Sequence, residues 1–236
     1  MEISQQVSKR TCPESEIYNE VLSLDDKRIL ELGCGKAEIT QDIACNGQNR
    51  AVIALEVDER QHEKNLTISD LPNVSFQTGG AEKIPVDKNS QDIVFMFKSL
   101  HHVPEDELDK ALQEIHRVLS PQGRAYISEP VYMGDFNTIL SLFNDEKHVR
   151  QAAFNAIKKA VDNELFILEK EIFFNVRVKF ENFEDFENKV LNVTHTNHQL
   201  SDDTYNAVKT AFGNHFNKYG GEFIAPMRVD LLQVRK

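Results

Sequence analysis

The chain has 236 residues, a length typical of one α/β domain with an appendage, and 38 acidic against 27 basic residues give it a net charge of −11. That charge disfavours nucleic-acid binding, which needs clustered Lys and Arg for phosphate contacts. Polar N-terminal residues, three unevenly placed cysteines and apolar runs far shorter than the roughly 20 residues of a membrane span predict a cytoplasmic protein without membrane insertion.

Short β-rich runs predict five strands, at 28–32, 51–55, 74–78, 93–97 and 124–128. Helical patterns lie between them, and the clearest is at 105–119, where apolar residues recur every three or four positions behind Pro104. Alternating strands and helices predict an α/β fold with a parallel sheet, right-handed crossovers and helices on both faces. Ligands of such sheets bind at the carboxyl ends of the strands, where the strand order reverses.

After residue 130 the pattern changes. The stretch 136–162 is amphipathic, 172–180 alternates like a strand, 201–217 is typical of a helix, and 222–233 predicts a last strand. No internal repeat, low-complexity segment or linker divides the chain, so we expect a single domain over 1–236. We interpret 131–219 as a region that partly covers the site and selects the substrate, outside a core formed by 28–130 and 220–236.

The most informative segment is the turn behind the first predicted strand, where Gly33 and Gly35 flank Cys34. Closely spaced glycines after a strand allow a tight turn in which the backbone approaches a ligand. The second apolar run is followed by Glu56, about 20 residues further on, where a carboxylate can accept hydrogen bonds from both hydroxyls of a ribose. This unit predicts a cofactor that contains adenosine.

Acidic residues around this turn distinguish between cofactors. A dinucleotide fingerprint places a third glycine where this chain has Glu38, and a carboxylate there would repel the pyrophosphate of NAD or FAD. Glu31, just before the glycines, adds a second negative charge. Such a turn suits S-adenosylmethionine, which carries a sulfonium and an ammonium group.

Four segments in this order resemble the motifs of class I S-adenosylmethionine-dependent methyltransferases. They are 28–36 at the first strand, 74–85 at the third, 90–103 at the fourth and 117–124 before the fifth. The resemblance covers residues 28–130 and is closest to the small-molecule branch that includes ubiquinone-type methyltransferases, although the N-terminal signature of the ubiquinone enzymes is not evident. It implies a Rossmann-like, doubly wound sheet that is mostly parallel, with an antiparallel last strand and helical insertions that cover the substrate.

The resemblance also implies a site for S-adenosylmethionine, with S-adenosylhomocysteine as its product. In that site Glu31 would orient the methionine ammonium and Glu56 would hold the ribose, with Asp58 either competing for the ribose or capping a helix. The implied cofactor site comprises Glu31, Gly33, Cys34, Gly35, Glu56, Val57, Gly80, Ala81, Glu82, Phe97 and Lys98.

At the adenine end the chain departs from this family. Relatives commonly carry an acid at the position of Gly80, and its side chain meets the adenine amino group. The backbone N–H of Ala81 could still reach a ring nitrogen. Glu82 either substitutes for the missing acid or packs against the helix that follows.

Candidate residues for the acceptor follow the fourth and fifth predicted strands. His101 and His102 are candidate bases because imidazole titrates near neutrality, and the alternative is that they pack against or cap the next helix. Glu129 and Tyr132 are placed to line an acceptor pocket.

Four further residues raise the question of a metal. His195 and His198 lie near Asp202 and Asp203, but nothing fixes a helix or a second ligand pair there. We therefore predict a polar loop and no metal site.

These features predict transfer of a methyl group to a small-molecule acceptor by in-line displacement. That reaction depends on alignment and exclusion of water, and it needs no covalent residue. Two alternatives remain: a protein that binds S-adenosylmethionine without turnover, and a nicotinamide-dependent oxidoreductase, suggested by the shared topology. The sequence leaves open the acceptor, the methylated atom and the oligomeric state, a homodimer included.

Overall fold

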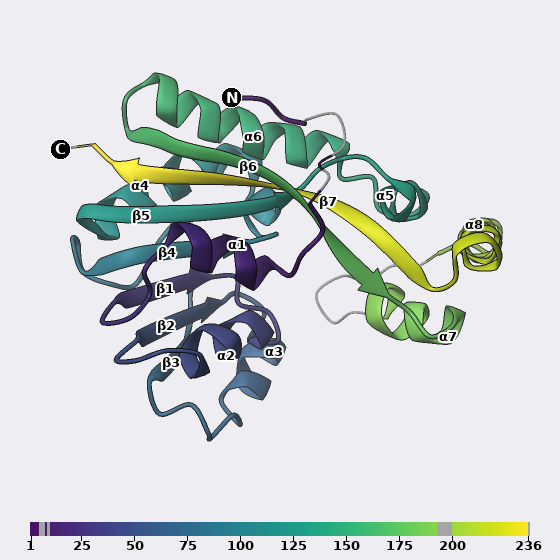
Figure 1. Ribbon diagram of the computed structural model, residues 1–236, viewed down its shortest axis with the longest axis horizontal. Coiled ribbons are helices and arrows are strands. Elements are labelled where there is room, and N and C mark those ends of the chain that lie inside the picture. The colour runs from purple at the N-terminus through teal and green to yellow at the C-terminus, as the bar shows by residue number, and fades with distance from the viewer. Residues whose placement is uncertain (5–7, 9, 193–199, 236) are drawn as a thin grey trace.

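The computed structural model describes residues 1–4, 8, 10–192 and 200–235. Within them, one seven-stranded sheet has the strand order β3-β2-β1-β4-β5-β7-β6 (Figure 1). The strands are β1 Arg28–Leu32, β2 Ala51–Glu56, β3 Val74–Thr78, β4 Gln91–Phe97, β5 Leu119–Pro130, β6 Phe166–Lys179 and β7 Glu222–Val234. Neighbours from β3 to β5 pair in parallel, whereas β7 is antiparallel to both β5 and β6. This arrangement confirms the predicted Rossmann-like fold.

Helices cover both faces of the sheet. They are α1 Glu14–Val21, α2 Glu38–Cys45, α3 Glu59–Asn65, the 3₁₀ turns η1 Leu100–His102 and η2 Glu105–Glu107, α4 Leu108–Val118, α5 Asp135–Leu140, α6 Lys147–Asp162, α7 Phe183–Phe186, the π-turn η3 Glu187–Leu191, and α8 Asp202–Tyr219. One hydrophobic core lies between the sheet and α1 with α2, and another lies between the sheet and α4 with α6. None of the helices in the described ranges is both long and apolar enough to cross a membrane.

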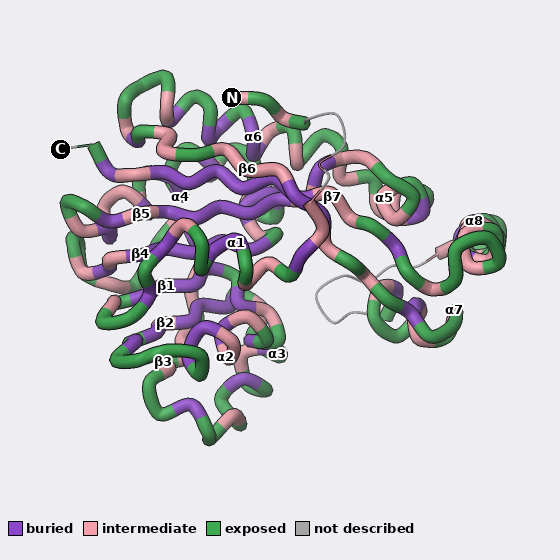
Figure 2. Tube along the Cα trace, viewed as in Figure 1, coloured by how far each residue is buried: buried purple, intermediate pink, exposed green. Residues whose placement is uncertain are grey.

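The strand β1 shows why the sheet forms. Successive side chains of a strand point to opposite faces, and here both faces are covered, so β1 is buried from Ile29 to Leu32 and is apolar there except for Glu31. Ile29 enters the core beside α1 and α2, whereas Leu30 and Leu32 enter the core beside α4 and α6. Figure 2 shows the central strands buried along most of their length.

The hairpin of β6 and β7 extends beyond the parallel strands and carries α5, α7 and α8 at its far end (Figure 1). A third core holds these elements together, and its centre is a cluster of phenylalanine rings. Phe180, Phe186, Phe212 and Phe223 are buried there with edge-to-face or tilted ring contacts. The third core therefore anchors a helical appendage at the end of the sheet where the parallel strands have their carboxyl ends.

The three largest differences from the sequence-based expectation concern β5, β6 and the stretch 136–162. Strand β5 begins at Leu119 and not at 124, because its pairing with β4 jumps from Gln91–Leu119 to Ile93–Arg124 around an irregularity. Strand β6 begins at Phe166 and not at 172, since its register with β7 also shifts between residues 168 and 170.

The third difference is a break inside the amphipathic stretch 136–162, which forms α5 and α6. The Asp145 carboxylate accepts the N–H of Lys147 at 3.1 Å, so a side chain satisfies a donor that would otherwise need a partner in a continuing helix. The N–H of Asn144 closes the last turn of α5 onto Leu140. As a result Glu146 becomes the first residue before α6.

Candidate functional site

The turn behind β1 is built on two glycines with left-handed backbones. Gly33 has φ +73° and Gly35 has φ +52°. The N–H groups of Gly33 and Cys34 both donate to the Leu55 carbonyl at 2.9 Å, which ties the turn to β2. A Cβ at Gly33 would lie 2.8 Å from Cβ of Ser99, whereas a Cβ at Gly35 would meet nothing within 4 Å. Gly33 therefore permits close packing, and Gly35 faces open space.

Glu56 closes this turn from β2. One carboxylate oxygen accepts the N–H of Gly35 at 2.7 Å, and the other accepts the N–H groups of Val57 and Asp58 at 2.9 Å each. Asp58 caps α3, because its carboxylate accepts the N–H of Arg60 at 2.9 Å. Of the two acids weighed for the ribose, Glu56 lies at the turn and Asp58 serves a helix.

Glu31 lies under the turn and is only 2 % exposed. Its carboxyl accepts a hydrogen bond from the Thr40 hydroxyl at 2.6 Å. Burial, and to a smaller extent the negative charge of Glu56, raise the pKa of Glu31 from its usual 4.5 to about 7, although the Thr40 hydrogen bond acts to lower it. A cation near this carboxyl would restore its charged form.

The segment after β3 brings the carboxylate of Glu82 to Gly80. A Cβ at Gly80 would lie 2.3 Å from each carboxylate oxygen of Glu82, so this carboxylate occupies the space that a side chain at position 80 would enter. Ala81 is buried between them in the chain. Val57, which directly follows β2, is 64 % exposed.

Lys98 follows β4 with a left-handed backbone, φ +54°, which is uncommon for a residue with a side chain. Its N–H donates to the Ser128 carbonyl of β5 at 2.7 Å, so the ends of β4 and β5 are locked together. Phe97, just before it, is buried in an aromatic cluster with Tyr18 and Tyr126. Strained backbone of this kind concentrates at binding sites.

A cavity of about 210 Å³ opens beside Lys98. Its walls are mostly apolar and include Pro130, Val131, Phe136, Leu140, Val176 and Pro226. Its polar lining comes from Lys98, His101, His102, Asn137, Glu146 and Arg150. The cavity therefore joins the carboxyl ends of β4 and β5 to the start of the helical appendage.

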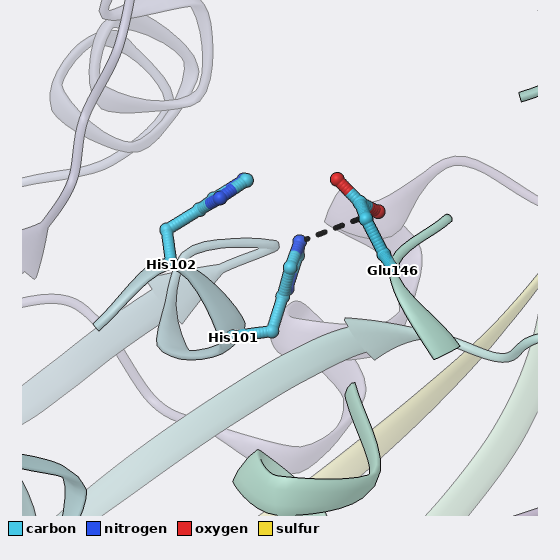
Figure 3. Close-up of side chains that lie close together, drawn as sticks. All are labelled: His101, His102 and Glu146. Atoms are coloured by element: carbon cyan, nitrogen blue, oxygen red, sulfur yellow. Dashed lines mark ion pairs between the residues drawn. The ribbon is translucent and has the colours of Figure 1, made fainter. Parts of the chain in front are cut away.

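His101 is buried between two carboxylates. Its Nδ1 contacts a carboxylate oxygen of Glu129, whose other oxygen accepts the N–H of Leu100 at 2.9 Å. On the opposite side Nε2 lies 3.7 Å from the carboxylate of Glu146 (Figure 3). The ring of His102, which is exposed, lies 4.1 Å from that of His101 between their centroids.

Arg150 holds Glu146 in this position. The guanidinium donates to the carboxylate of Glu146 at 2.5 and 3.1 Å, and to the side-chain oxygen of Asn137 at 2.9 Å. Burial would raise the pKa of Glu146, but the charge and hydrogen bond of Arg150, together with the charge of His101 whenever that ring is protonated, lower it below its usual value. Glu146 is thus an anion at neutral pH.

The remaining candidate residues are placed differently. Tyr132 lies outside the cavity lining, with its hydroxyl hydrogen-bonded to Asp145 and Lys147 over its ring. Glu129 is not part of the cavity lining, but its carboxylate contacts His101, which is. His195 and His198 lie outside the residues that the structure describes.

Sequence reasoning missed Glu146 and Arg150. Their spacing of four residues is a signal, but the same spacing stabilises many solvent-exposed helices and points to no site. Within the described residues, the ligand atoms of His101, His102 and Glu146 lie within 4.8 Å of one another, which is a spacing that could hold a metal ion.

Comparisons with known proteins find similarity to methyltransferases. A family model described as a methyltransferase domain matches residues 29–123. A relative from Oceanobacillus iheyensis, described as an uncharacterized methyltransferase, is 23% identical over 176 residues, which is 72% of this chain and 79% of that protein. An uncharacterized methyltransferase of Schizosaccharomyces pombe is 33% identical over 111 residues, 47% of this chain and 42% of its own length, so this match spans less than half of that relative.

Among solved structures, the YcgJ protein of Bacillus subtilis matches with a TM-score of 0.66 and 16% identity, over 94% of this chain and 97% of its own. This likeness extends over the helical appendage as well as the sheet. At this identity it establishes the shared fold.

The glycine turn yields a prediction for stability. Gly33→Ala should lower the free energy of unfolding by clearly more than Gly35→Ala, because the added Cβ meets Ser99 in the first case and open space in the second. The left-handed backbone itself should cost about 1–2 kcal/mol in each. Gly35→Ala is therefore the control for the backbone cost alone. Urea denaturation measures both variants, and equal losses for Gly33→Ala and Gly35→Ala would contradict the packing argument.

Proposed function

We propose that the protein binds S-adenosylmethionine and transfers its methyl group to a small-molecule acceptor, and the match of residues 29–123 to a methyltransferase domain model supports this proposal. The observation that carries the proposal is a pair of buried carboxylates, Glu31 and Glu56, beneath a glycine turn that opens into free space. Carboxylates at this position would attract a cationic ligand and repel a pyrophosphate.

The cofactor would lie across the carboxyl ends of β1, β2 and β4. Gly33, Cys34 and Gly35 would supply the close backbone approach, and Glu56 would accept the ribose hydroxyls. Glu31 would face the methionine ammonium, either directly or through a water. The backbone of Phe97 and Lys98 would lie beside the methionine chain.

At the adenine end, Glu82 would take the place of the acid that Gly80 lacks. Its carboxylate already lies where a side chain at position 80 would begin, so it can accept a hydrogen bond from the adenine amino group. The backbone N–H of Ala81 would meet a ring nitrogen, and the exposed side chain of Val57 would cover one face of the ring.

The acceptor would occupy the cavity beside Lys98. In-line displacement needs the nucleophile, the methyl carbon and the sulfur on one line, so an acceptor site adjoining the methionine end of the cofactor is a geometric requirement. Apolar walls exclude water from that line. His101 and His102 are the candidate proton acceptors, and the leaving group is a neutral thioether.

Isothermal titration with S-adenosylmethionine and S-adenosylhomocysteine tests the cofactor directly, and NADH and NADPH serve as competitors. Binding of the sulfur ligands with micromolar or tighter affinity supports the proposal. Binding of NADH or NADPH in their place would support an oxidoreductase. Binding without methyl transfer to a broad acceptor panel would support a protein without turnover.

Cofactor affinity should depend on pH through Glu31. In the protein without ligand, the carboxyl of Glu31 has a pKa of about 7. A bound ammonium or sulfonium would lower this pKa, so binding below neutral pH must release a proton. Affinity should therefore fall as the pH drops below about 7, by up to about tenfold per pH unit, and level off above it. Calorimetry in buffers of different ionisation enthalpy measures the released proton.

Glu31→Gln is the control because it cannot release a proton, and its affinity should be lower but flat over this pH range. The unliganded fold should respond with the opposite sign. A raised pKa means that the folded state holds its proton more tightly, so this carboxyl's contribution to the free energy of unfolding decreases as pH rises from 4.5 to about 7. A wild-type affinity independent of pH would contradict the role of Glu31.

The adenine contact can be tested by moving the carboxylate. Glu82→Ala should weaken S-adenosylmethionine binding by about 1–3 kcal/mol, because a hydrogen bond to a charged acceptor is lost. Adding Gly80→Asp in that background should restore most of the affinity, since removal of the Glu82 carboxylate frees the space next to position 80. Glu63→Ala, an exposed acid on α3, is the charge control. Failure of the double variant to recover would place the effect of Glu82 elsewhere.

A further inference from the structure

The cavity beside Lys98 has the size and lining of a site for one aromatic ring. A cavity of about 150 Å³ is enough to bind benzene, and this one measures about 210 Å³, which leaves room for a ring with small substituents. Phe136, Val131 and Pro226 contribute to its apolar walls. Four of the ionisable lining residues, His101, His102, Glu146 and Arg150, lie close together, so a ligand would need an apolar body with a polar group at one end.

The tautomer of His101 follows from its partners. The carboxylate of Glu129 can only accept a hydrogen bond, so Nδ1 of the neutral ring carries the proton and donates it. Nε2 of the same ring then has a lone pair. That atom belongs to a residue of the cavity lining and faces the Glu146 side.

Glu146 completes the arrangement without blocking it. Its carboxylate lies 3.7 Å from Nε2, which is beyond hydrogen-bond distance, so the lone pair remains available to a ligand. When Nε2 gains a proton, the ring becomes a cation with a carboxylate on each side. Glu129 and Glu146 would both stabilise that charge.

We propose that the acceptor is a phenol and that His101 removes its proton, an inference that rests on the proposed methyl transfer. A phenol is an apolar ring with one polar group, and its pKa near 10 leaves it protonated at neutral pH, so it needs a base. The phenolic oxygen bonds to the methyl carbon as the carbon–sulfur bond breaks, and that electron pair stays on the sulfur. The phenolic proton passes to Nε2 of His101 and later to solvent.

Within this scheme Glu129 is a positioning residue. It holds His101 in the tautomer that leaves Nε2 without a proton, as carboxylates do for histidine in other acid–base sites. Arg150 keeps Glu146 charged and in place. The same contact disfavours a metal ion on His101, His102 and Glu146, because the cationic guanidinium already lies 2.5 Å from a carboxylate oxygen of Glu146.

The experiment compares two acceptors that differ in their need for a base. Methyl transfer from labelled S-adenosylmethionine is measured at about pH 8 with phenol, which is still protonated there, and with 4-nitrophenol, which is largely ionised there. His101→Gln should lower kcat/KM for phenol by about 100- to 1,000-fold and for 4-nitrophenol by less than about tenfold. Glu129→Gln should show a smaller loss with the same selectivity. His148→Gln, an exposed histidine paired with Glu105 outside the cavity, is the matched control.

Thermal unfolding of each variant verifies folding, and Glu129→Gln carries the comparison if His101→Gln does not fold. Equal losses with both acceptors would show that His101 is not a base and would overturn the proposal. So would a wild-type protein that binds S-adenosylmethionine and methylates neither phenol. Loss of activity with EDTA and recovery with a divalent ion would identify a metal site in place of the base. Absence of S-adenosylmethionine binding in calorimetry would instead overturn the proposed function, so the two failures are distinguishable.

Discussion

Burial of carboxylates at the carboxyl ends of parallel strands is the constraint on which the site depends. Glu31 on β1, Glu56 on β2 and Glu129 on β5 are each less than a tenth exposed. A buried charge without partners would be strongly destabilising, so each carboxylate has its own donors. These are the Thr40 hydroxyl for Glu31, three backbone N–H groups for Glu56, and the Leu100 N–H with the His101 ring for Glu129.

The three carboxylates have different numbers and kinds of hydrogen-bond donors, and we expect different roles for them in binding and proton transfer for that reason. Glu56 is held by backbone donors that are fixed by the turn, so its geometry is preorganised. Glu31 has one hydroxyl, and its raised pKa shows that the folded protein disfavours its charge. Glu129 faces a side chain that can itself carry a proton. A cationic ligand would act mainly on Glu31, and proton transfer would act mainly on Glu129.

The sequence predicted the sheet well because its signals are local. The runs at 28–32 and 74–78 match β1 and β3 at both ends, and the glycine turn lies where its spacing placed it. Strand β5 and strand β6 were longer than predicted because pairing across irregular register extends them, and pairing is not visible in a single segment. The depth at which Glu31 is buried also depends on α2, which supplies Thr40. Burial of that kind arises only when separate elements pack.

The acceptor side was less predictable for a physical reason. The break before α6 is set by a short polar segment, Asn144 to Glu146, and amphipathic periodicity continues across it. The contact between Glu146 and His101 joins the N-terminus of α6 to η1, and Arg150, one turn into α6, holds Glu146 in place. No single segment of the sequence contains both partners of that contact. The sequence indicated the histidine pair by its place after β4, but it did not indicate the carboxylate of Glu146 that lies beside it.

Lys98 connects the two sides of the site. Its left-handed backbone bends the chain directly after β4, and its N–H is fixed to the Ser128 carbonyl on β5. Since Ser99 packs against Gly33 and Leu100 bonds to Glu129, three consecutive residues touch the glycine turn, the end of β5 and the cavity. A shift in this bend would move the cofactor turn and the His101 ring together. The strain at Lys98 is therefore consistent with a segment that holds a methyl donor and its acceptor on one line.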